Sequence, residues 1–269
     1  LHPRVRRQRQ MCIRDSTYAD GGWDAVKRDA EEKADLLLSL GINVNLAPVC
    51  DMTSDEYGFM YDRSFSVDVD MENRYVRTVV ETSKSKKLGT VLKHFPGYGN
   101  NSDTHTGIAY DDRDYSEFEN TDFKPFYQGI ESGADCILVS HNIVNCMDSE
   151  YPASLSQKVH DILRNEFKFD GVIMTDDLIM DAITDFTGDE AAAVTAAKCG
   201  NDLLCCSSVD TQYPAVLEAV QNGEISEAQV DASVKRILKW KQNLGIFNID
   251  TYQKKVKSTE PTDTVGSEE

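Results

Sequence analysis

Two short segments of the sequence carry side chains whose spacing could support proton transfer and covalent chemistry. In the first, Asp103 and His105 lie two residues apart within residues 91–107, VLKHFPGYGNNSDTHTG. If this segment is extended, both side chains point the same way, so Asp103 can accept a hydrogen bond from one imidazole nitrogen and leave the other free to move a proton. The alternative is a turn stabilised by Asp103 and Thr104, with a solvent-exposed histidine.

The second segment is VIMTDDL, in which Asp176 and Asp177 follow a short apolar run. Two carboxylates this close raise the pKa of one of them, and a carboxylate at the end of a strand can act as a nucleophile or general base. Alternatively, Asp177 caps the next helix while Asp176 faces water. The spacing alone does not choose between the two residues. One nucleophilic carboxylate and one proton shuttle are together what a retaining glycoside hydrolase requires.

Further polar residues stand where other apolar runs end. Asp51 follows APV, Lys93 and His94 follow TVL, and His141 follows ILVS. In parallel α/β folds the working residues lie on the loops after the strands, so these positions predict one shared site. The alternatives are an ion pair of Lys93 and His94 with Asp51, and a structural His141 that donates to a neighbouring carbonyl.

The hydrophobic pattern from Gly22 onward predicts the elements that position these residues. Helical periodicity predicts helices at residues 23–41, 71–89, 121–135, 154–171, 189–202 and 226–245. Thr121 or Asp122 is the expected cap of the third helix, and a serine starts the fourth. Apolar runs predict five strands, at residues 42–49, 90–95, 136–144, 172–176 and 203–208. Strands that alternate with helices of this length predict an α/β fold with a parallel sheet.

Composition excludes several classes of partner. The formal net charge of -18 argues against nucleic acid or an anionic membrane, because both need a cationic face. There is no apolar run of about 18 residues, so no membrane span is predicted. The seven cysteines form no CxxC pair and are expected to be reduced. A metal site from His94, His105 and His141 is the weaker alternative, since the carboxylates lack ligand-like spacing. No cofactor is expected.

The two ends of the chain differ from the rest. Residues 1–16, LHPRVRRQRQMCIRDS, hold five arginines and one aspartate. A basic arm for nucleic acid is one interpretation, but the segment looks like translated adaptor or cloning sequence, and we exclude it from the fold as non-native or unstructured. Residues 251–269 form an acidic tail that we expect to be disordered. One domain at residues 17–250 remains.

The motifs KHFPGYGNNSDTH, APVCD, DRSFS, PASLS, GVIMTDDLIMDAI and CGNDLL follow one another in this order along the chain. Together they resemble family 3 of the glycoside hydrolases, in its β-N-acetylglucosaminidase branch. The resemblance runs from about Ala19 to about Gly245. It implies a (β/α)8 TIM-type barrel and removal of terminal β-linked N-acetylglucosamine, or N-acetylhexosamine, with retention of configuration through a covalent glycosyl-Asp intermediate.

The resemblance also assigns roles. It implies Asp176 as the nucleophile, and His105 as the acid/base with Asp103 as the partner that orients it. Arg63, Lys93 and His94 are implied to hold the sugar, and we expect His141 to line the same mouth. Arginine and lysine are donors without acceptors, which suits binding of hydroxyl or acetamido oxygens. The alternative for Arg63 is a surface salt bridge with Asp62, Asp68 or Asp70.

Three departures from the family pattern set further expectations. Tyr98 stands where the family often has histidine, and the span from Gly99 to Asp103 is one residue shorter than usual, which affects how far this loop reaches. About five of eight barrel strands are present, so the barrel is expected to be incomplete and N-terminally truncated. Five strands cannot close an eight-stranded barrel. We therefore expect the chain as given to be a poorly folded, nearly inactive fragment of an enzyme.

Other functions compatible with the sequence are a phosphorylase on the same scaffold, a β-glucosidase or xylosidase, and a catalytically silent carbohydrate-binding fragment. Retention of Asp176 with the Asp103 and His105 pair speaks against the silent binder. Peptidoglycan fragments, as in cell wall turnover, chitin oligomers and host glycans are all candidate substrates. The compartment, cytoplasmic or secreted, is left open, since any signal would lie upstream.

Overall fold

A four-stranded parallel sheet forms the centre of the molecule. The computed structural model describes residues 14–249 and residue 251. The strand order is β1-β2-β4-β6, so each strand pairs with the next along the chain, as in a barrel wall. The bounds are β1 Val44–Asn45, β2 Gly89–Phe95, β4 Cys136–Val139 and β6 Val172–Thr175. Bridges from Val49 to Lys93 and from Met174 to Leu203 extend the sheet. The predicted α/β fold with a parallel sheet is therefore confirmed.

One face of the sheet is covered by helices that follow the strands. These are α2 (Arg14–Ser39), α3 (Val69–Ser85), α5 (Phe123–Glu131) and α6 (Gln157–Asp161), the last continuing as a π-helical stretch at Ile162–Glu166. Leu92, Ile137 and Ile173 of the strands pack against Val80 of α3 and Leu163 of the π-helical stretch in one buried cluster. Alternation of side chains along each strand sends its other residues to the opposite face.

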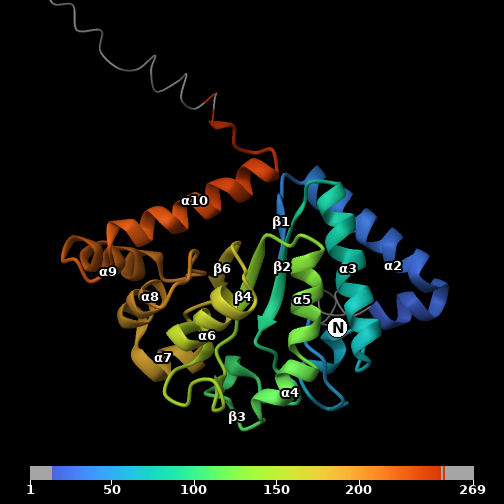
Figure 1. The fold of residues 1–269 in the computed structure, drawn as a ribbon, viewed down its shortest axis with the longest axis horizontal. Coiled ribbons are helices and arrows are strands. Elements are labelled where there is room, and N and C mark those ends of the chain that lie inside the picture. Colours follow the sequence, from blue (N-terminus) through green and yellow to red (C-terminus); the bar gives the residue numbers. More distant parts are fainter. Residues whose placement is uncertain (1–13, 250, 252–269) are drawn as a thin grey trace, which may run out of the picture.

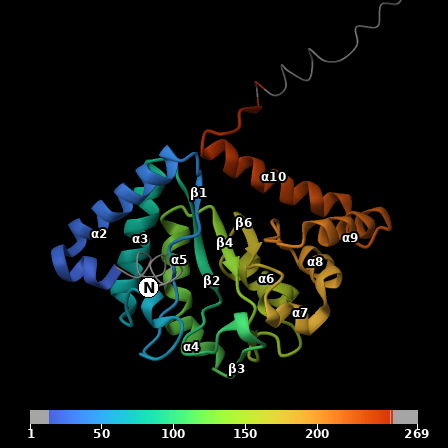
Figure 2. The same cartoon turned by 180° about the vertical axis from the view of Figure 1, so that it is seen from behind.

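The helix α10 (Glu227–Asn243) packs against the opposite face of the sheet, near the end at which the strands begin. Trp240 of α10 and Leu244 just beyond it are buried against Val91, Cys136 and Val172. Figure 1, and Figure 2 from behind, show α10 lying across the end at which the strands begin. The strand ends that carry the predicted site therefore lie away from α10.

The predicted helices are present, with differences at their ends. Ser156 and Ser226 cap α6 and α10 by accepting from the N–H groups of Val159 and Gln229. Asp122, however, makes no cap at α5, because its carboxylate binds Arg113 instead. The helix predicted at 23–41 starts earlier, with a break at Gly21 and Gly22. The strand predicted at 203–208 contributes only the bridge at Leu203.

Several short elements were not predicted. They are the helices α4 (Tyr115–Asn120), α7 (Asp181–Thr187) and α9 (Val209–Gln221), and the strand β3 (Tyr110–Asp111). The strand predicted at 136–144 is divided into β4 and β5 (Ile143–Val144), and β5 pairs in parallel with β3. The helix α8 (Asp189–Lys198) matches the prediction for residues 189–202.

The predictions for the two ends of the chain lie almost entirely outside the described residues. Only residues 14–16 of the basic segment are described, as the first turn of α2, and only residue 251 of the tail. Within the described part of the chain, no helix combines the length and the apolar character that a membrane crossing requires.

Candidate active site

The polar residues predicted at the strand ends gather at one end of the sheet. Asp51 follows the bridge at Val49, Lys93 and His94 belong to β2, His141 follows β4, and Asp176 follows β6. The carboxyl ends of parallel strands meet at the same edge, so the topology brings these side chains together. All of them except Asp176 are more than nine-tenths buried.

Asp51, His94 and Arg63 form a hydrogen-bonded chain. Nδ1 of His94 donates to Asp51 Oδ2 at 2.7 Å, and the backbone N–H of His94 donates to the same oxygen at 3.0 Å. On the other side of the ring, Nη2 of Arg63 donates to Nε2 of His94 at 3.0 Å. Arg63 therefore bonds to His94, and the contact considered between His94 and Asp51 is present as a hydrogen bond.

Electrostatics support an anionic Asp51 beside a neutral His94. Burial acts to raise the pKa of Asp51, but the hydrogen-bonded His94 and the Tyr98 N–H hold it below 3.8. Burial lowers the pKa of His94 below 6.5. The negative charge of Asp51 acts to raise this pKa, but the positive charges of Arg63 and Lys93 act to lower it. Nε2 of His94 thus carries no proton when it accepts from Arg63.

His141 is held by the protein on both sides of its ring. Nδ1 lies 2.7 Å from the Ser154 hydroxyl, and Nε2 donates to the carbonyl oxygen of Asp177 at 3.0 Å. Burial lowers the pKa of His141, so the ring is neutral, with the proton on Nε2 and the Ser154 hydroxyl donating to Nδ1. This is the structural role that the sequence left open, and it fixes the turn that follows Asp176.

Asp176 and Asp177 differ in how their carboxylates are used. Asp177 Oδ2 accepts from the Ser207 hydroxyl and Oδ1 from the Ile179 N–H, so this residue stabilises the local turn. Asp176 Oδ1 accepts from the Asp177 N–H at 2.9 Å. Burial acts to raise the pKa of Asp176, but His94, His141 and Lys93 lower it overall, which keeps the carboxylate ionised.

Asp103 and His105 are joined as the spacing predicted, but through a different backbone conformation. Nδ1 of His105 donates to Asp103 Oδ1 at 2.6 Å. The segment is a 3₁₀ turn at Thr104–Thr106 that Asp103 caps, rather than an extended strand. The His105 side chain is 60% exposed and that of Asp103 is 33% exposed. The turn packs against α7, the helix that follows Asp176 and Asp177.

Tyr98 anchors the loop that carries this pair. Its hydroxyl lies 2.6 Å from Thr104 Oγ1, and its backbone N–H donates to Asp51 Oδ1 at 2.8 Å. The ring is buried edge-on against His94 and Phe59. The residue that departs from the family pattern is therefore a structural link between Asp51 and the turn at His105.

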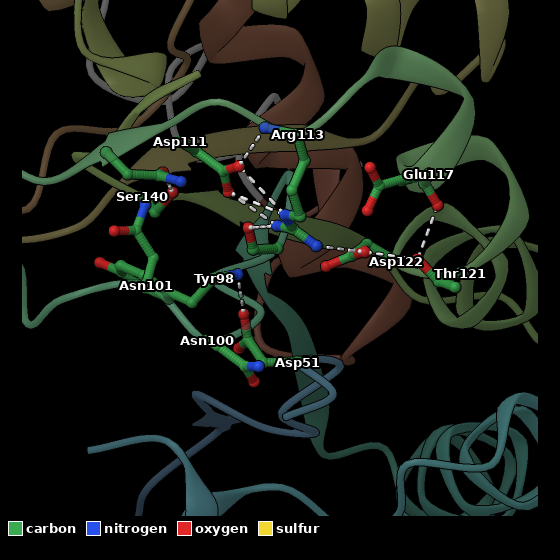
Figure 3. Close-up of polar contacts among 12 residues, drawn as sticks. Asp51, Tyr98, Asn100, Asn101, Asp111, Arg113, Glu117, Thr121, Asp122 and Ser140 are labelled. Carbon is green, nitrogen blue, oxygen red and sulfur yellow. Dashed lines mark hydrogen bonds and ion pairs between the residues drawn. The ribbon is translucent and has the colours of Figure 1, made fainter. Parts of the chain in front are cut away.

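Arg113 is a contributor that the sequence did not point to. It lies between Asp111 and Asp122 and donates to the carbonyl of Gly97, next to Tyr98 (Figure 3). The run DDRD around it reads as an ordinary charged loop, and its partners are known only once the loops meet in space. Among the residues that the structure describes, no group of three or more histidine, cysteine or acidic side chains is arranged to hold a metal ion.

Comparisons with known proteins agree with this architecture. The model of the Glycosyl hydrolase family 3 N terminal domain matches residues 13–240. A curated β-hexosaminidase of Hydrogenovibrio crunogenus is 33% identical over 199 residues, which are 72% of this chain and 55% of that protein. A β-hexosaminidase of Nitrosomonas eutropha is 33% identical over 65% of this chain and 51% of its own length. The chain thus spans about half the length of these relatives.

Among solved structures, a glycoside hydrolase family 3 β-N-acetylglucosaminidase from Paenibacillus sp. str. FPU-7 superposes with a TM-score of 0.81 at 30% identity. The match covers 88% of this chain and 46% of that one. A family 3 glycosyl hydrolase from Mycobacterium smegmatis gives a TM-score of 0.75 at 28% identity, over 83% of this chain and 71% of that one.

Proposed function

The chain belongs to glycosyl hydrolase family 3, and from this premise we propose that it carries the catalytic site of a retaining β-N-acetylhexosaminidase. Its substrate is a saccharide that ends in β-linked N-acetylglucosamine. The observation that carries the proposal is the presence of two groups at one end of the sheet: a partly buried, ionised Asp176 and an imidazole oriented by Asp103. Two groups of this kind are what the double-displacement mechanism needs.

In the proposed mechanism Asp176 is the nucleophile. A carboxylate oxygen of Asp176 attacks the anomeric carbon, the bond from that carbon to the glycosidic oxygen breaks, and a covalent glycosyl ester forms. Asp177 is less suited to this role, because both of its carboxylate oxygens already accept hydrogen bonds within the protein. The pKa of Asp176 lies below its ordinary value, so the carboxylate is deprotonated, as a nucleophile must be.

His105 is the acid and base of the same cycle. In the first step its protonated ring gives a proton to the departing glycosidic oxygen, and in the second the neutral ring takes a proton from the water that cleaves the ester. Asp103 accepts from Nδ1 and so presents Nε2 to the reaction. The exposed position of His105 suits a group that must reach a leaving group near solvent.

Sugar binding falls to the cationic groups around Asp176. Arg63 and Lys93 supply donors for hydroxyl and acetamido oxygens, while His94 aligns Arg63 through Nε2. We assign His141 a positioning role, because its contact with the Asp177 carbonyl leaves no ring nitrogen for a substrate. Terminal residues of peptidoglycan fragments or chitin oligomers fit this chemistry equally.

Turnover of paired aryl glycosides tests the function. Because the chain as given is expected to be nearly inactive, the full-length protein is incubated with p-nitrophenyl N-acetyl-β-glucosaminide and with p-nitrophenyl β-glucoside, each with and without inorganic phosphate. We expect release of p-nitrophenol from the first substrate only, with β-configured N-acetylglucosamine as the first product. Formation of a sugar 1-phosphate that depends on phosphate would instead establish a phosphorylase. Turnover of the glucoside alone would contradict the proposed substrate class.

A further inference from the structure

We propose that Arg113 is a positioning residue that acts together with Asp51 to set the location of His105. The inference rests on the proposed function, which makes His105 the acid and base. Arg113 touches neither the imidazole nor the strand ends that bear Asp176, and it acts through one peptide group, the one that joins Gly97 to Tyr98.

The Arg113 guanidinium is fixed on three sides. Its Nε and Nη2 donate to the carboxylate of Asp111 at 2.8–3.1 Å, and its Nη1 donates to Asp122 Oδ2 at 2.9 Å. The plane lies over the ring of Phe118, with Cζ 4.2 Å from the centroid. Both carboxylates are buried, with 3% of each side chain exposed. A planar fork held by two buried acceptors has one orientation available.

The peptide group between Gly97 and Tyr98 is hydrogen-bonded to a charged side chain at its carbonyl oxygen and to another at its N–H. Nη2 of Arg113 donates to its carbonyl oxygen at 3.2 Å, and Asp51 Oδ1 accepts from its N–H at 2.8 Å. Figure 3 shows the dashed contact from Tyr98 to Asp51 on one side and Arg113 between its two carboxylates on the other. Hydrogen bonds to charged groups are the stronger ones, so this peptide is a fixed point in the loop.

The glycines beside this peptide let the charged groups come close. A Cβ at Gly99, where φ is +53°, would lie 2.8 Å from the Cζ and Nη1 atoms of Arg113. A Cβ at Gly97 would overlap the Asp122 carboxylate, and its φ of +123° also excludes other residues. Side chains at these positions would push Arg113 and Asp122 away from the loop.

From this fixed peptide, the loop reaches His105 through Tyr98. The Tyr98 hydroxyl contacts Thr104, the fully buried neighbour of His105 in the 3₁₀ turn. On its other side, Asp51 is the carboxylate that orients His94 and, through it, Arg63. The Asp51 carboxylate therefore connects the proposed sugar-binding residues, His94 and Arg63, with the loop that carries His105. By holding the same peptide of that loop, Arg113 keeps His105 at a fixed distance from them.

The first test uses hydrogen exchange in the full chain. Arg113→Lys keeps the positive charge but removes the planar guanidinium, whose nitrogens contact Asp111, Asp122 and Gly97 at the same time. Arg164→Lys is the matched control, because Arg164 is also a mostly buried arginine bound to a buried aspartate, Asp202, away from this loop. We expect backbone amides from Tyr98 to His105 to exchange at least about tenfold faster in Arg113→Lys than in the native chain or the control. Equal exchange in all three proteins would overturn the proposal.

The second test asks whether Arg113 acts through His105. With a p-nitrophenyl substrate, we expect Arg113→Lys to lower kcat on the order of 10- to 100-fold with little change in KM, as for a misplaced catalytic group. In a His105→Ala background, the same substitution should cost no more than about twofold, because the group it positions is gone. An additive loss in the double variant would overturn the proposal.

The two tests separate this inference from the proposed function. If the full-length protein turns over no aryl N-acetylglucosaminide, the proposed function fails, while the exchange comparison still decides whether Arg113 holds the loop. If turnover is present and exchange around Tyr98 is unaffected by Arg113→Lys, the function stands and the positioning role is wrong. Denaturant unfolding of each variant identifies any general loss of folding, which would appear as faster exchange throughout the chain.

Discussion

Asp103 accepts two hydrogen bonds from His105, one from its backbone N–H at 3.0 Å and one from Nδ1 at 2.6 Å. The same carboxylate oxygen therefore caps the turn and fixes the ring, so the orientation of the imidazole is built into the local backbone. A histidine held this way has a defined tautomer with Nε2 directed outward.

Removal of the imidazole should show as a dependence on the leaving group. We expect His105→Ala to lower kcat on p-nitrophenyl N-acetyl-β-glucosaminide by about 10²- to 10⁴-fold. The loss should be far smaller with a dinitrophenyl substrate, whose leaving group needs no proton. Added azide should restore turnover and give a glycosyl azide, because azide attacks the glycosyl ester without a base. Equal losses on both substrates would argue against an acid and base role.

Tyr98→Phe should weaken the loop without touching substrate. The substitution leaves the buried Thr104 hydroxyl without its 2.6 Å partner, at a cost of about 1–3 kcal/mol in unfolding free energy. Tyr115→Phe is the control, since the Tyr115 hydroxyl bonds to Glu166 at the surface, and it should change stability by less than about 0.5 kcal/mol. Urea unfolding of both variants measures the difference, and equal stability of the two would refute the role given to Tyr98.

Arg63→Met should act mainly on substrate binding. Loss of a charged donor to sugar oxygens corresponds to about 1.5–3 kcal/mol, or roughly a 10- to 150-fold fall in kcat/KM. We expect the change to appear largely in KM. Lys86→Met, which removes an exposed ion pair with Asp35, should leave both kinetic constants unchanged. Michaelis–Menten kinetics of the two variants check this, and an unchanged kcat/KM in Arg63→Met would show that Arg63 does not bind sugar.

The buried histidines predict how stability depends on pH. Burial lowers the pKa values of His94, His141 and His160 below 6.5, so the unfolded chain takes up protons below pH 6.5 that the folded chain resists. This stability is present above pH 6.5 and is lost as the pH falls from there toward the folded pKa values, by at most about 1.4 kcal/mol per pH unit for each histidine. His160→Gln removes one of the three, away from the proposed site.

Urea unfolding at pH 7.5, 6.5 and 5.5 measures this effect. The free energy of unfolding of the native chain should fall more steeply over this range than that of His160→Gln. The difference between the two slopes isolates one histidine from the carboxyl groups. Parallel slopes would show that folding leaves the pKa of His160 unchanged, which would contradict the lowered value.

The sequence predicted much of the architecture because its strands contain short runs of apolar residues between polar segments. The segments at β2, β4 and β6 stand out for this reason, whereas the segment at 203–208 ends in two serines and forms only one bridge. The helix α9 was missed, since Pro214 lies inside it and argues against a helix there. In α9, packing against α8 overrides that local signal.

The site was predictable where it depends on neighbours in sequence. The contact of Asp103 with His105 was predicted from their spacing, although for an extended segment, while the choice of Asp176 over Asp177 came from the family resemblance. The Arg63 contact with His94 and the grip of Arg113 on Gly97 join segments 16 to 31 residues apart, and only the folded loops bring them together. The sequence could not show that both ring nitrogens of His141 are hydrogen-bonded within the protein, because a structural histidine and a substrate-binding histidine look the same in sequence.

The central claim is that Asp176 forms a covalent bond to the sugar. The most direct test treats the full-length protein with a 5-fluoro N-acetylglucosaminyl fluoride, which forms the glycosyl ester but hydrolyses slowly, and maps the label by peptide mass spectrometry. We predict one label per chain, on Asp176, absent in Asp176→Asn and retained in Asp177→Asn. A label on Asp177 or another residue would contradict the account, as would turnover that proceeds unchanged in Asp176→Asn.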